Sequence, residues 1–111
     1  MSNDTNPDKW LIMKLAFDDK IIYKLVMGWN GNYLEGSSWR TNTGIDSVSY
    51  DPPTECYVFK GVRGNQYVCH KDRYGKDYTN ELGYKHVEEH HLKAIEMSVM
   101  SKDTNWMALK Y

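Results

Sequence analysis

Histidines and glutamates with metal-binding potential lie together near residue 90 of the 111-residue chain, in His86-Val87-Glu88-Glu89-His90-His91. The spacing matches H-x-x-E-H, a pattern in which two histidines bind zinc and the glutamate acts as general base. His86 and His90 are four positions apart and would share one face of a helix. One hypothesis is therefore a small metal-dependent enzyme that uses His86, Glu89 and His90, with His86 and His90 as ligands. The alternative is that these histidines are ordinary polar or core residues.

Basic and aromatic side chains gather in the middle of the chain. Residues 56–76 hold five basic groups and one acidic group, whereas the segments before and after them are net acidic. Tyrosines and a histidine are interleaved with these basic groups, an arrangement that can hold phosphate and stack a base or a peptide ring. The pattern predicts a surface for an anionic partner. The alternative is a solvated hairpin whose lysines protect a sheet edge from aggregation.

A tryptophan beside an arginine, Trp39-Arg40, lies in a segment rich in Ser, Thr and Asn. Such a pair is typical of an anchor at a binding surface. Guanidinium groups would pair with carboxylate or phosphate, and the aromatic rings would supply area that loses water on binding. The predicted contact surface consists of Trp39, Arg40, Arg63, His70, Lys71, Arg73 and Tyr74. A nucleic-acid or nucleotide-binding module that uses residues 60–76 is the alternative.

Composition limits the classes of protein that fit. The formal charge of −1 argues against a generally basic nucleic-acid binder and against an acidic nucleic-acid mimic. A hydrophobic content of 41% supports a folded core, and the length supports a single domain over 1–111. No G-x-S-x-G, P-loop or G-x-G-x-x-G motif occurs, so we expect no cofactor and a non-enzymatic role.

The termini and cysteines bear on location. The N-terminal residues lack the pattern of a signal peptide, and the longest apolar run, Trp10–Met13, is too short for a membrane span. Cys56 and Cys69 form no CxxC motif, and we expect both to be thiols. These features predict a cytoplasmic protein with no membrane contact.

The first half of the chain is apolar with an alternating pattern. Residues 1–8 are expected to be a flexible tail. Residues 9–29 alternate as two strands around Asp18-Asp19-Lys20, which predicts a hairpin. A helix that starts near Asn6-Pro7 is the competing interpretation, and we favour the hairpin because strand formers are frequent. Asn30-Gly31 predicts a further turn.

Strand signals continue through the middle. Residues 45–50 predict a short strand, and residues 51–54, with two prolines, predict a turn. Residues 56–60 and 65–69 predict a hairpin with a four-residue loop at 61–64. Cys56 would then oppose Cys69, and Val58 would oppose Tyr67. These four side chains would form one inward face.

The C-terminal third predicts a helix. Apolar residues recur at helical spacing over 84–100, and Trp106, Met107 and Leu109 follow as an apolar hook. The whole pattern predicts an α+β fold, a twisted antiparallel sheet of four to six strands with one C-terminal helix packed on one face. An exposed edge strand or the histidine-rich helix would allow a homodimer.

Three segments carry a resemblance to a known group of proteins. They are Trp29-Asn30-Gly31-Asn32-Tyr33-Leu34, Ser38–Ile45, and the 57–59 and 64–71 stretches of the middle hairpin. Over about residues 29–75 the chain resembles small uncharacterised accessory open reading frames of tailed bacteriophages. The resemblance implies an accessory or host-takeover factor that binds a host or phage macromolecule, most often a protein, in the host cytoplasm. It carries no active site and does not reach the predicted helix or its histidines at 86, 90 and 91.

Overall fold

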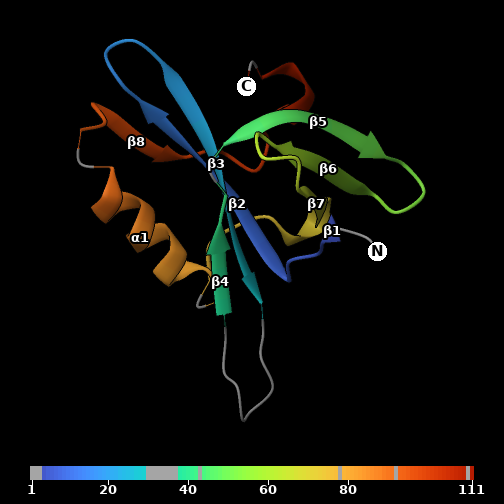
Figure 1. Cartoon of the computed structure of the whole chain (residues 1–111). Helices are drawn as coiled ribbons and strands as arrows, with labels where there is room; N and C mark the ends of the chain where they lie inside the picture. Colours follow the sequence, from blue (N-terminus) through green and yellow to red (C-terminus); the bar gives the residue numbers. More distant parts are fainter. Residues whose placement is uncertain (1–3, 30–37, 43, 78, 92, 110) are drawn as a thin grey trace.

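The computed structural model describes residues 4–29, 38–42, 44–77, 79–91, 93–109 and 111 (Figure 1). Within these residues the chain forms eight strands, one α-helix and two short 3-10 turns. The strands are β1 (Asp4–Thr5), β2 (Lys9–Ala16), β3 (Ile21–Trp29), β4 (Ser38–Thr41), β5 (Ile45–Asp51), β6 (Cys56–Gly61), β7 (Gln66–His70) and β8 (Glu96–Val99). The helix is α1 (Glu81–His90), and the 3-10 turns are η1 (Lys71–Arg73) and η2 (Trp106–Ala108).

The strands form two four-stranded sheets, in the orders β1-β7-β6-β5 and β4-β3-β2-β8. All neighbours are antiparallel except β1, which runs parallel to β7. The α+β prediction is confirmed, although the strands are divided between two sheets instead of forming one. In Figure 1, α1 lies on one side of the β2–β3 hairpin, and β5, β6 and β7 lie on the other.

The β2–β3 hairpin is buried on both faces from Trp10 to Met13 and from Leu25 to Gly28. Trp10 and Ile12 pack toward the β5–β7 sheet, in a cluster with Phe59. Leu11 and Met13 belong to a second cluster on the helix side. A strand that is covered on both faces needs apolar residues at successive positions. This explains the unbroken apolar run at the start of β2.

The predicted hairpin over 9–29 is confirmed. Strands β2 and β3 pair from Lys9 with Gly28 to Ala16 with Ile21, so the competing helix is wrong. The expected tail at residues 1–8 is held from Asp4 onward, because Asp4 and Thr5 pair with β7. The turn predicted at Asn30-Gly31 lies outside the described residues.

The β6–β7 hairpin has a different register from the predicted one. Lys60 pairs with Gln66, so Cys56 opposes His70 and Tyr57 opposes Cys69. The connection is three residues long, because the Gly61 amide donates to the Asn65 carbonyl at 2.8 Å and closes the ladder there. Gly64 has a φ of 91°, the left-handed conformation that this loop type requires. The inward face consequently carries Phe59, Tyr67 and Cys69, and not Cys56 and Val58.

The helix predicted over 84–100 is only partly correct. Helix α1 spans Glu81–His90, and the chain then turns, with the Ala94 amide donating to the His91 carbonyl at 3.0 Å. Residues 96–99 form β8, which pairs with the free edge of β2. Met97 packs into the same cluster as Leu11, so tertiary contacts outweigh the helical periodicity of this segment.

The predicted C-terminal hook closes the core. Trp106 is 2% exposed and lies 5.7 Å from the Trp10 ring, between centroids. The Tyr111 hydroxyl donates to the Trp106 carbonyl at 2.6 Å, which brings the C-terminal residue back over the core. In the described part of the chain, no helix has the length and apolar character needed to cross a membrane.

Candidate functional site

Trp39 and Arg40 of the predicted contact surface lie on opposite faces of β4. Trp39 opposes Gly28, and its ring packs on α1, 5.1 Å from the His86 ring. A side chain at Gly83 would lie within 3.2 Å of the Trp39 ring. The Trp39 side chain therefore packs between α1 and β4. Arg40 opposes Met27, which packs toward the β5–β7 sheet, and so lies on the other side.

His70 and Lys71 lie at the end of β7, beside an acidic residue. The Lys71 amino group is 3.5 Å from Glu55 Oε1, and His70 Nε2 is 3.9 Å from Glu55 Oε2. His70 Nδ1 accepts a hydrogen bond from the Asp72 amide at 3.1 Å. The pKa of Lys71 is raised, chiefly by Glu55 and then by Tyr50 and Asp72. The positive charge at this end is therefore compensated locally.

Glu55, His70 and Asp72, at this end of β7, form a group with metal-binding potential. Ligand atoms of Glu55, His70 and Asp72 lie within 4.8 Å of one another, a convergence that the described residues show nowhere else. Two of the three are exposed, and the two carboxylates approach different ring nitrogens of His70. The Asp72 amide already occupies Nδ1, so His70 serves as a cap of η1.

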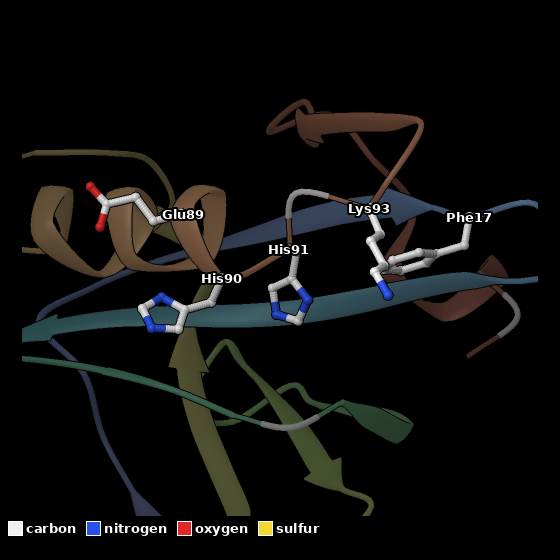
Figure 2. Close-up of a pocket in the computed structure, with 5 residues that line it drawn as sticks. All are labelled: Phe17, Glu89, His90, His91 and Lys93. Atoms are coloured by element: carbon white, nitrogen blue, oxygen red, sulfur yellow. The ribbon is translucent and has the colours of Figure 1, made fainter.

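The zinc hypothesis at His86, Glu89 and His90 finds no support in the arrangement. The His86 and His90 rings stack with centroids 4.0 Å apart, and His90 Nδ1 lies 2.9 Å from the His86 carbonyl oxygen. Figure 2 shows Glu89 pointing away from His90. Among the described residues, no third ligand atom of a His, Cys, Asp or Glu lies together with those of His86 and His90, although a zinc site needs at least three.

Arg73 and Tyr74 contact other parts of the chain. Arg73 Nη1 is 3.9 Å from an Asp8 carboxylate oxygen. Tyr74 is half-buried, lies edge-on to Trp10 at 4.7 Å, and donates its hydroxyl proton to the Met100 carbonyl at 2.5 Å. Burial raises the pKa of Tyr74 to about 12. Tyr74 therefore stabilises the core, and its hydroxyl is bonded within the chain.

The remaining arginines, Arg40 and Arg63, come together. They line one hollow of about 140 Å³ between the two sheets. We call it the arginine hollow, and it is lined by Arg40, Thr41, Asn42, Gly61, Arg63, Asn65 and Tyr67. None of these residues is acidic. Neither arginine has an ion pair or hydrogen bond to a residue that the structure describes.

A buried asparagine positions this hollow. Asn42 is 5% exposed, and its Oδ1 accepts from the Leu25 amide at 2.8 Å while its Nδ2 donates to the Gly44 carbonyl at 2.9 Å. That carbonyl also accepts from the Val62 amide at 3.1 Å. The crossover from β4 to β5 is thereby fastened to the β6–β7 turn. The sequence marks Asn42 only as part of a polar turn, so its role in bringing Arg40 and Arg63 together could not be read from it.

The arginine hollow presents donors and positive charge. Each guanidinium offers five N–H groups in a planar fork that fits a carboxylate or a phosphate. The Asn65 amide and the Tyr67 phenol add further donors at the rim and wall. Two positive groups at one hollow repel each other, and an anion between them would remove that repulsion. The arrangement is thus suited to hold one anionic group.

A larger hollow of about 350 Å³ lies at the C-terminal end of α1 (Figure 2). We call it the histidine hollow, and it is lined by Phe17, Glu89, His90, His91 and Lys93. The His91 ring is edge-on to Phe17 at 6.5 Å. Burial lowers the pKa of His91, and nearby Lys24, His90 and His86 lower it further. His91 is therefore neutral near pH 7, and the helix carbonyls beside it also oppose an anion.

Comparisons with known proteins identify no family. The chain matches no protein-family model, no curated protein and no solved structure. The resemblance of residues 29–75 to bacteriophage reading frames thus stays a prediction. A functional proposal therefore depends on the arrangement of the side chains in this fold.

Proposed function

We propose that the chain is a small non-enzymatic binding protein that holds an anionic group of a macromolecular partner in the arginine hollow. The observation that supports this is the convergence of Arg40, from β4, and Arg63, from the β6–β7 turn, on one hollow without an acidic residue among its described lining. Such paired guanidiniums bind a carboxylate or phosphate through bidentate, charge-assisted hydrogen bonds.

A protein partner fits the charge distribution better than a nucleic acid. Binding to a nucleic acid requires a row of phosphate contacts. Three of the other four basic groups of the middle segment have partners within the chain, which argues against such a row. Lys71 pairs with Glu55, Arg73 lies beside Asp8, and the Lys76 amino group lies 4.6 Å from the centre of the Tyr84 ring. The overall charge of −1 also gives little general attraction to a polyanion. A single carboxylate of a protein suits the site.

The resemblance to bacteriophage reading frames suggests the setting of this binding. We place the protein among phage accessory factors, with a host or phage protein as partner in the host cytoplasm. Cys56 and Cys69 are both free thiols, which suits a reducing compartment.

The first test is an NMR titration of the ¹⁵N-labelled protein with an octapeptide that is blocked at both ends and carries one glutamate in a glycine–serine background. Amide shifts should concentrate in residues 40–42 and 61–67. Arg40→Gln or Arg63→Gln should weaken binding about tenfold, because each loses a charge-assisted hydrogen bond. Arg73→Gln is the matched control, since Arg73 lies outside the hollow, and it should bind like the natural protein.

A thymidine oligonucleotide of ten nucleotides distinguishes a protein partner from a nucleic-acid partner. The proposal predicts weak binding of this oligonucleotide and a shallow salt dependence for the peptide, equivalent to about one or two ion pairs. Tighter binding of the oligonucleotide, with a steep salt dependence and sensitivity to Lys60 and Lys76, would instead establish the nucleic-acid module. A partner captured from host lysate by the natural protein and by Arg73→Gln, but not by the Arg40→Gln/Arg63→Gln double variant, would identify the target.

A further inference from the structure

A third hollow, which is mainly apolar, adjoins the arginine hollow. It has a volume of about 220 Å³ and is lined by Ile21, Ile22, Tyr23, Gly44, Ile45, Val62 and Tyr111. We call it the apolar hollow. Ile21 is 51% exposed and Val62 is 60% exposed, so two aliphatic side chains at this hollow remain in contact with water. Exposed apolar groups that line a hollow gain free energy when another apolar group covers them.

The two hollows lie on either side of one backbone contact. The Val62 amide donates to the Gly44 carbonyl, which also accepts from Asn42. Val62 and Gly44 line the apolar hollow, while the chain neighbours Arg63 and Asn42 line the arginine hollow. A ligand that reaches across this contact would meet positive charge on one side and aliphatic surface on the other.

We propose that the anionic partner segment is a short acidic peptide with an apolar side chain close to its carboxylate. This inference rests on the proposed function. The carboxylate binds Arg40 and Arg63, and the apolar side chain fills the hollow between Ile21, Val62 and Tyr111. The arginine hollow offers charge and polar donors but no aliphatic side chain among its lining. The neighbouring apolar hollow therefore determines which acidic segments bind well.

The lining of the apolar hollow favours a peptide side chain over a nucleobase. Its walls are mainly aliphatic, and its two tyrosine rings pack edge-on against each other with centroids 5.6 Å apart. Burial raises the pKa of Tyr111, and its hydroxyl already donates to the Trp106 carbonyl. The edge-on contact covers one ring face, and the polar edge of a base would find few partners among the described lining residues. An aliphatic or aromatic side chain needs none.

Blocked octapeptides provide the test, with one glutamate in a glycine–serine background and a leucine placed one, two, three or four residues away. The leucine should raise the affinity of the natural protein about fivefold to tenfold in the peptide with the best spacing. Val62→Ser and Ile21→Ser should abolish that gain without weakening binding of the peptide that lacks leucine. The matched controls Val99→Ser and Ile95→Ser change exposed residues of similar size elsewhere and should keep the gain.

The outcomes separate this inference from the proposed function. If Arg63→Gln weakens every glutamate peptide but leucine adds nothing at any spacing, the arginine hollow binds acids and the inference is wrong. If Arg63→Gln has no effect on any peptide, the proposed function fails and the inference fails with it. A peptide without glutamate but with an unblocked C-terminal leucine distinguishes the source of the carboxylate. Its tighter binding would support the inference with a chain terminus as the anion.

Discussion

The arginine hollow and the histidine hollow are both lined by basic side chains, yet only the smaller one suits an anion. The arginine hollow, of about 140 Å³, holds two guanidiniums that stay charged at any pH a protein tolerates. The histidine hollow, of about 350 Å³, holds imidazoles, one of which has a lowered pKa, and the charge of its one lysine, Lys93, is opposed by that of Glu89 in the same lining. The charge of the side chains that line a hollow thus indicates its ligand better than the volume of the hollow does.

The two hollows also depend on different parts of the fold. The arginine hollow is fastened by the hydrogen bonds of buried Asn42 between β3, the crossover to β5 and the β6–β7 turn. The histidine hollow depends on the position of α1, which packs through Gly83 on Val26 and Trp39. Substitutions can therefore disturb one hollow and leave the other intact.

The largest effect is expected from Asn42→Ala. The change leaves the buried Leu25 amide and the Gly44 carbonyl without side-chain partners. The free energy of unfolding should fall by about 2–4 kcal/mol, as measured by urea denaturation. NMR shifts should spread over 40–42 and 61–67 and not reach the end of α1. Asn65→Ala removes an exposed amide from the same hollow and should cost little, and an equal cost for both variants would contradict this role for Asn42.

Gly83→Ala should have the next largest effect. Its methyl group would lie 2.8 Å from Val26 Cγ1 and 3.2 Å from the Trp39 ring, so α1 must move away from the sheet. The gain in helix propensity offsets part of the strain, which leaves a net loss of about 1–2 kcal/mol. Thermal unfolding and the NMR shift of the Trp39 indole N–H would report it. Leu82→Ala, at an exposed position of α1, is the control. A shift of the arginine-hollow amides would show that the two hollows are coupled.

Sequence patterns predicted the strands and turns better than they predicted which residues pair between strands. The alternation over 9–29 and the turn signals over 51–64 identified the two hairpins, because period-two patterns report a pleated strand directly. The register of the second hairpin was missed by one residue, because a loop with glycine at both ends is compatible with either three or four residues. The strand at 96–99 was missed because pairing with the edge of β2 overrides a helical apolar stripe.

The fold brings together only some of the predicted contact residues, because their positions also depend on contacts between distant segments. The sequence identified Arg40 and Arg63 as binding residues, and the fold places both at one hollow. It grouped Trp39 with Arg40, although neighbours on a strand point to opposite faces. It could not show that Tyr74 lies against Trp10 or that Arg73 lies beside Asp8, because those contacts join segments more than sixty residues apart.

A smaller effect is expected from pH at the histidine hollow. The pKa of His91 is lowered in the folded protein, so the unfolded chain binds the proton first as the pH falls below about 6.5. Stability should therefore fall with pH from 6.5 down to the lowered value, and should not change above that window on account of His91. Urea denaturation at pH 7.5, 6.5 and 5.5 should show a shallower loss for His91→Gln than for the natural protein. His70→Gln, at the end of β7 in the other sheet, is the control, and an unchanged slope for His91→Gln would contradict the assignment.

The smallest effect on stability is expected from the arginines themselves. Arg40→Gln and Arg63→Gln remove charges that have no partner among the described residues, so neither change breaks an ion pair there. The free energy of unfolding should stay within about 0.5 kcal/mol of the natural value and rise slightly at low salt, because repulsion between the two guanidiniums is relieved. The rise should vanish at high salt and should not depend on pH, in contrast to the histidine hollow. A loss of more than about 1 kcal/mol in either variant would mean that the arginine stabilises the fold. That result would contradict the proposal that the hollow is a binding site.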